Sequence, residues 1–77
     1  MITQDALTEL IRRALPDAQV QVVDRTGTMD HFDVLIRSKV FAGIPLMDRH
    51  RLVEQAVKDA RADGRIHALA IRTEVSD

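Results

Sequence analysis

The chain contains no cysteine, and this absence limits how a protein of only 77 residues can be stabilised. Disulfide bridges, a zinc knuckle and an iron–sulfur cluster held by this chain alone are excluded, because each of them needs thiols or thiolates. A domain of about 60 residues buries only about 60% of its unfolded surface, so a chain this short depends on one well-packed hydrophobic core. We therefore expect residues 1–77 to form a single domain, since a second core could not be filled.

The N-terminal segment has the pattern of an amphipathic helix that Pro16 ends. Thr3 is a good N-cap, and Ile2 and Leu7 occupy the two positions of a hydrophobic staple. The apolar residues that recur at helical spacing, and so define the side facing the core, are Leu7, Leu10, Ile11, Ala14 and Leu15.

Two stretches of alternating apolar and polar residues follow, and both predict β-strands. The first covers 19–24 and the second covers 31–38. The side chains directed toward the core are Val20 and Val22 in the first strand and Phe32, Val34 and Ile36 in the second. The strands should form a hairpin, and its loop at 25–30 is longer than a tight two-residue turn, so it has room for a function.

A second helix is expected from about Leu46 or Asp48 to Asp63, with Gly64 as its C-terminal cap. The connector before it, at 41–45, has room for a short helical turn. The expected core stripe of this helix consists of Leu52, Val53, Ala56, Val57 and Ala60.

The last strand is expected over 66–73, with a short polar tail at 74–77. A helix connects it to the strand at 31–38, and such a crossover joins parallel strands. The sequence therefore predicts an α/β (α+β) fold, a two-layer α-β-β-α-β sandwich with a three-stranded mixed sheet and both helices on one face. The other, open face should carry Gln19, Gln21, Asp33, Arg37, Ala68, Ala70 and Arg72.

The charges nearly balance, with a formal net charge of −1, which argues against a general binder of nucleic acid or of anionic membranes. No signal-peptide pattern and no apolar run of membrane-spanning length is found, so the expectation is a cytoplasmic protein. The chain has no glycine-rich phosphate loop, no cysteine nucleophile and no convincing serine triad. We therefore expect it not to be an enzyme.

Three histidines are the only side chains that titrate near neutral pH. His31 begins the second strand and His67 begins the third. Taken singly, each is more simply explained as a structural or solvent-exposed histidine. Because the second and third strands should be parallel, however, both residues are expected at the same end of the molecule, where two imidazoles could form part of a metal site.

The third histidine lies in a basic segment, Arg49-His50-Arg51, near the start of the second helix. The simpler interpretation is that the Arg49 stem covers the end of the core. The alternative is a basic patch that receives carboxylates of a partner, glutathione or a phosphate. The sequence leaves both interpretations open.

Five stretches together carry a resemblance to a known family: VVDRTG at 22–27, HFDV at 31–34, FAG at 41–43, RHRLV at 49–53 and IHAL at 66–69. They occur in this order over nearly the whole chain. The combination of RHRLV with the later IHAL is more specific than either motif alone. On these residues the chain resembles the BolA family.

The resemblance implies a fold related to the type II KH domain and partnership with a monothiol glutaredoxin of the CGFS type. In that complex a [2Fe–2S] cluster is shared: the glutaredoxin supplies its cysteine and a bound glutathione thiolate, and the BolA-like chain supplies the histidine that matches His67. A second ligand comes from the hairpin loop. Many relatives carry a cysteine or histidine there, whereas this chain has Thr28. Two alternatives follow: His31 is the second ligand, or the second ligand from this chain is weak or absent.

Three hypotheses follow from the sequence. The leading one is a non-enzymatic adaptor in iron–sulfur cluster trafficking or iron and redox sensing, with His67 and His31 as cluster ligands and Thr28, Arg49 and His50 at the partner surface. The second is a KH-like nucleic-acid-binding transcriptional regulator. The third is an interaction module without metal, in which all three histidines are structural. Alone, the chain is expected to be a monomer or a weak homodimer.

Overall fold

The computed structural model describes residues 1–76 and contains helices and strands in the predicted order, with one additional break. The elements are α1 (Gln4–Ala14), β1 (Gln19–Asp24), β2 (His31–Ser38), the 3-10 helix η1 (Lys39–Phe41), α2 (Leu46–Ala56), α3 (Lys58–Ala62) and β3 (Ala68–Val75). None of the helices in these residues combines the length and the apolar character needed to cross a membrane.

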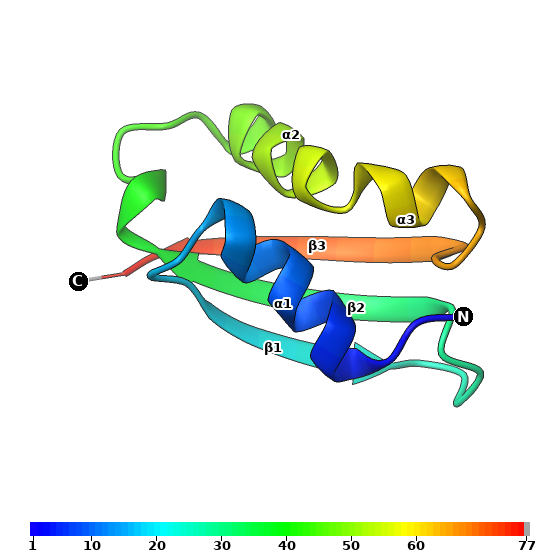
Figure 1. Ribbon diagram of the computed structural model, residues 1–77. Helices are drawn as coiled ribbons and strands as arrows, with labels where there is room; N and C mark the ends of the chain where they lie inside the picture. Colours follow the sequence, from blue (N-terminus) through cyan, green and yellow to red (C-terminus); the bar gives the residue numbers. More distant parts are fainter. Residues whose placement is uncertain (77) are drawn as a thin grey trace.

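The strands form one mixed sheet in the order β1-β2-β3. β1 pairs antiparallel with β2, and β3 pairs parallel with β2 in a register that places His31 opposite Ala68 and Ser38 opposite Val75. The helices α1, α2 and α3 lie on the same face of the sheet (Figure 1). The predicted two-layer α-β-β-α-β sandwich is therefore confirmed.

α1 begins and ends as the sequence predicts. The Thr3 hydroxyl accepts a hydrogen bond from the Ala6 N–H at 3.1 Å, and both residues of the staple, Ile2 and Leu7, are buried. The prediction that Ala14 faces the core is wrong, because it is exposed. It is the last residue of α1, and the chain leaves the helical conformation at Leu15, whose side chain is the one that is buried.

The core lies between the sheet and the helices and draws residues from every layer. Its buried members are Ile2, Leu7, Ile11, Leu15, Ala18, Phe32, Val34, Ile36, Phe41, Val53, Val57, Ala60 and Ile66. Val20 and Val22 of β1 are half-buried and pack against this cluster, as the alternation predicts. Three alternate side chains of the central strand β2 are therefore fully buried in this core: Phe32, Val34 and Ile36.

The expected single helix up to Asp63 is instead two helices that meet at Val57. This residue has φ −107° and ψ 11°, outside the α-helical region, although its side chain is buried. The segment around it contains neither glycine nor proline, so the sequence carries no local signal for the break. Leu52 was expected in the core stripe but is 39% exposed, because α2 packs through the neighbouring Val53.

The last strand is shifted by two residues relative to the predicted range, 66–73. It starts at Ala68 because β2 starts at His31, its partner in the register. It continues through Glu74 and Val75 because β2 extends to Ser38, and Arg37 and Glu74 approach across the strands to 3.8 Å. Two residues of the predicted polar tail are therefore strand, and Asp77 lies outside the described residues. The short helical turn also falls earlier than expected, at η1.

The turn after α1 is tied to the end of β2 by the carboxylate of Asp17. It accepts hydrogen bonds from the Ser38 hydroxyl at 2.8 Å and from the Lys39 N–H at 2.9 Å. The Lys39 N–H and then the Ser38 hydroxyl hold the pKa of Asp17 below its ordinary value. The folded state therefore favours the ionised carboxylate over the protonated one.

We expect Asp17→Asn to lower the free energy of unfolding at pH 7, because the carboxylate accepts from the two donors with separate oxygens and the amide has a donor NH2 group in place of one of them. A depressed folded-state pKa stabilises the protein fully above the unfolded pKa of about 3.9, and this contribution is lost as the pH falls through the folded pKa. The difference between wild type and variant should therefore shrink below about pH 4. Urea denaturation at neutral and acidic pH measures this difference in unfolding free energy. A difference that stays constant with pH would contradict the role assigned to the ionised Asp17 carboxylate.

Candidate functional site

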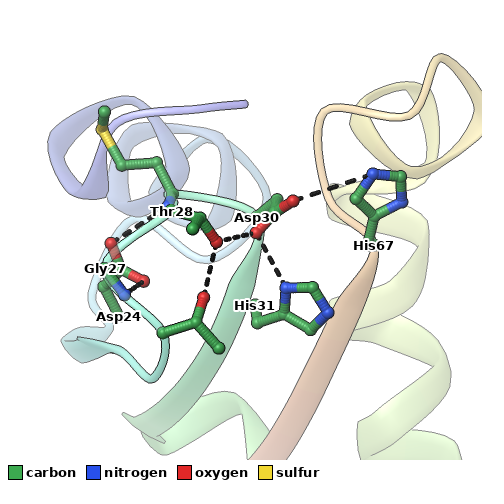
Figure 2. A network of polar contacts seen from close by, with 8 residues as sticks. Asp24, Gly27, Thr28, Asp30, His31 and His67 are labelled. Carbon is green, nitrogen blue, oxygen red and sulfur yellow. Dashed lines mark hydrogen bonds and ion pairs between the residues drawn. The ribbon is translucent and has the colours of Figure 1, made fainter.

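The hairpin loop at 25–30 is ordered by a carboxylate at the end of β1. Asp24 accepts hydrogen bonds from the N–H groups of Gly27 at 3.0 Å and Met29 at 3.1 Å. Gly27 and Met29 both have positive φ, 74° and 60°, so the chain makes a tight local path here. The hydrogen bonds of Asp24 fix the conformation of the loop, and the loop in turn fixes the positions of Asp30 and His31 at the start of β2 (Figure 2).

Asp30 connects the loop to the start of β3. Its backbone carbonyl accepts the N–H groups of His67 at 2.8 Å and Ala68 at 3.2 Å. Its side chain accepts a short hydrogen bond from the Thr28 hydroxyl and lies 2.7 Å from Nδ1 of His31. The other carboxylate oxygen lies 3.7 Å from Nε2 of His67. Asp30 therefore contacts both histidines, and we call these contacts the Asp30 network (Figure 2).

The structure brings His31 and His67 together, as the parallel pairing of β2 and β3 predicts. Their ring centroids are 6.0 Å apart, and the ring planes are tilted by 42°. The side chains are 42% and 62% exposed, respectively, so a partner in solution can reach both rings. A hollow of about 550 Å³ lies beside His31, and its lining includes Arg25, Thr26, Ala68 and Ala70.

The carboxylate of Asp30 is held in its ionised form. The Thr28 hydroxyl, and next the contact with His31, place the pKa of Asp30 below its ordinary value. An ionised carboxylate only accepts hydrogen bonds, so the proton of the short contact with His31 resides on Nδ1. Nε2 of His31 is then the nitrogen whose lone pair is available to a metal.

Among residues 1–76, no group of three or more histidine, aspartate or glutamate side chains is arranged to hold a metal ion. The histidine pair does offer exposed imidazole nitrogens, which are ligands that iron accepts. A [2Fe–2S] cluster needs four ligands, and two of them can be imidazoles. The two imidazoles at this end of the sheet therefore fit a cluster whose remaining ligands come from another molecule, and His67 and His31 are the residues that would hold it.

Arg49 and His50 lie away from the histidine pair. The Arg49 guanidinium donates to the Ile44 carbonyl at 2.8 Å and lies 5.9 Å from the ring centroid of the buried Phe41. His31 starts β2, and Phe41 follows its other end. The strand has eight residues, so its two ends are about 23 Å apart at about 3.3 Å per residue. Arg49 thus covers the end of the core, as its simpler interpretation predicts, and a role of Arg49 and His50 in partner binding stays a prediction.

Sequence reasoning missed the residue that links this site together. Asp30 is not among the candidate residues that the sequence indicates, although it directly precedes His31 in the chain. The sequence signal that could have identified Asp30 is a carboxylate residue directly before a histidine at the start of a strand. The contact with His67 joins residues far apart in the sequence, so only the folded chain reveals it.

These features define a class of small α+β proteins. Its members have three strands in a mixed sheet, helices on one face and an exposed imidazole pair at one end of the sheet. Residues 10–77 match the family model described as "BolA-like protein". The chain therefore belongs to the BolA-like family, which confirms the resemblance seen in the sequence.

Known relatives and structures agree with this assignment. The chain is 30% identical over 73 residues to Protein BOLA2 of Arabidopsis thaliana, covering 94% of this chain and 76% of the relative. A shorter match of 47 residues, 49% identical, covers 61% of this chain and 43% of the "DNA-binding transcriptional regulator BolA" of Vibrio cholerae. The crystal structure of a Bol-like protein from Babesia bovis superposes with a TM-score of 0.82 at 29% identity, covering 97% and 86% of the two chains.

Proposed function

We propose that this protein is a non-enzymatic BolA-like adaptor that binds a monothiol glutaredoxin of the CGFS type and co-ligates a shared [2Fe–2S] cluster. His67 is the principal ligand from this chain, and His31 is the second. The glutaredoxin cysteine and its bound glutathione supply the thiolates that this cysteine-free chain lacks. The adaptor would act in iron–sulfur cluster trafficking or in sensing iron and redox state.

The observation that carries the proposal is the exposed histidine pair, with ring centroids 6.0 Å apart. A chain without cysteine supports such a cluster only by adding nitrogen ligands to thiolates from elsewhere. When bound, a cluster with histidine in place of thiolate has a raised reduction potential and responds to protonation. This chain's own contribution is to hold two imidazoles at one accessible edge and to keep Nε2 of His31 available.

We expect the purified protein to change the visible absorption and circular dichroism of a CGFS glutaredoxin reconstituted with glutathione, iron and sulfide. The physical reason is that imidazole replaces part of the cluster's thiolate ligation. Titrating this protein into the holo-glutaredoxin measures the change, and His31→Ala reports whether the second imidazole contributes. A cluster spectrum that is identical with and without this protein would refute co-ligation.

The second candidate function is a KH-like nucleic-acid-binding regulator, and the name of the Vibrio cholerae relative favours it. The arginines that would contact phosphates are Arg49, Arg51, Arg61, Arg65 and Arg72. Three of them already face carboxylates within this chain, at 3.3 Å from Asp48, 3.5 Å from Glu54 and 2.8 Å from Asp63. Specific retention of a DNA duplex at physiological salt would favour this function, whereas non-specific phosphate binding would collapse as salt rises.

A further inference from the structure

We infer that Asp30 is a positioning residue, which sets the tautomer of His31 and holds both imidazoles at their separation. Where it concerns the cluster, this inference rests on the proposed function. As a statement about the two histidines in the free protein, it is testable without any partner. It also assigns a role to Thr28, which lies in the same network.

The contact with His31 determines which nitrogen is free. Asp30 lies 2.7 Å from Nδ1, the distance of a strong hydrogen bond to a charged acceptor. Histidines that bind metals generally donate their other ring N–H to a carboxylate or carbonyl, and this contact orients the ring and raises the basicity of the ligating nitrogen. Asp30 and His31 already have this arrangement in the free chain, with Nε2 directed away from the carboxylate.

The contact with His67 is made through the backbone as well as the side chain. The Asp30 carbonyl accepts the His67 N–H at 2.8 Å and so fixes where β3 begins. The separation of 3.7 Å between the carboxylate and Nε2 is longer than a hydrogen bond, so no side-chain hydrogen bond from Asp30 fixes this ring. One residue thus determines the placement of both histidines, but it leaves the His67 ring freer than the His31 ring.

The hydroxyl of Thr28 supports the carboxylate. It donates its proton to Asp30, and the Thr26 hydroxyl lies 2.5 Å from the Thr28 oxygen. Since Thr28 has used its only proton, Thr26 is the donor of that second bond. Thr28 therefore acts on the histidines through Asp30. It does so at the loop position where the family resemblance places a direct cluster ligand.

The test in the free protein uses nitrogen-15 NMR of the imidazoles at about pH 9, where a free histidine is neutral. We expect His31 to be mainly the Nδ1–H tautomer in wild type, to become mainly Nε2–H in Asp30→Ala, and to be intermediate in Asp30→Asn, which retains one acceptor oxygen. Asp48→Ala removes the same charge beside Arg51 and should leave His31 unchanged. If folded Asp30→Ala retains the wild-type tautomer, Asp30 does not position His31.

The test in the complex measures how fast a chelator removes iron from the shared cluster. Loss of an outer contact to a metal-binding histidine typically lowers metal affinity by about 10–100-fold, so Asp30→Ala should shorten cluster lifetime by about tenfold or more. Thr28→Val should shorten it less and leave the backbone spectrum intact. An unchanged lifetime in Asp30→Ala would refute positioning toward the cluster. If wild type itself holds no cluster, the proposed function fails, while the tautomer result still decides the role of Asp30.

Discussion

His67→Ala is expected to abolish the change that the wild-type protein makes in the visible circular dichroism of the glutaredoxin cluster. The variant removes the more exposed imidazole of the pair, with 62% of its side chain accessible, and leaves no donor in its place. Its backbone N–H still donates to the Asp30 carbonyl, so the start of β3 is retained. Exposed substitutions of this kind usually change stability by no more than about 0.5 kcal/mol. The loss should therefore be chemical and not structural.

His50→Ala is the matched control for this prediction. It removes an imidazole from the first part of α2, at the end of the molecule where Arg49 covers Phe41, and not at the histidine pair. At saturating concentrations of this variant the wild-type spectral change should persist, because His50 is not a cluster ligand; a contribution of His50 to partner binding would change only the concentration needed to reach it. If His67→Ala binds the holo-glutaredoxin and still produces the wild-type spectrum, His67 is not a ligand and the proposed adaptor loses its principal donor.

The features that sequence predicts well are those specified by neighbouring residues. The cap at Thr3 and the end of α1 before Pro16 depend on contacts within a few positions. The alternation in β2 follows from one buried face, because a shift by one residue would expose Phe32 and Val34. These local rules also implied the parallel crossover, and through it the meeting of His31 and His67.

The features that sequence does not predict depend on distant partners. The length of β3 is set by its pairing with β2, so Glu74 is strand despite its polarity. The break at Val57 has no local signal, and the exposure of Leu52 follows from the way α2 lies on the core. Asp30 belongs to the same class, since its contact with His67 exists only when the hairpin loop meets β3.

Phe32→Ala is expected to have the largest effect on stability of any change in β2. Phe32 is 1% exposed in the central strand, where it lies between Asp24 of β1 and Leu69 of β3 in the sheet register. Truncating a buried phenylalanine costs about 3–5 kcal/mol, because apolar contacts are lost and a cavity remains. Natural domains have only about 5–15 kcal/mol of stability in total, and a small one has a core that is hard to enlarge. The variant should therefore be largely unfolded at moderate temperature.

Leu35→Ala in the same strand is the control, because Leu35 is half-buried on the open face and should lose well under half as much stability. Thermal and urea unfolding, followed by circular dichroism, compare the two variants with wild type. A Phe32→Ala protein as stable as Leu35→Ala would contradict the core assignment. The comparison also separates two ways of losing the cluster signal. Phe32→Ala should lose the signal because the end of the sheet that carries His31 no longer forms. His67→Ala should lose the signal although its unfolding transition is the same as that of wild type.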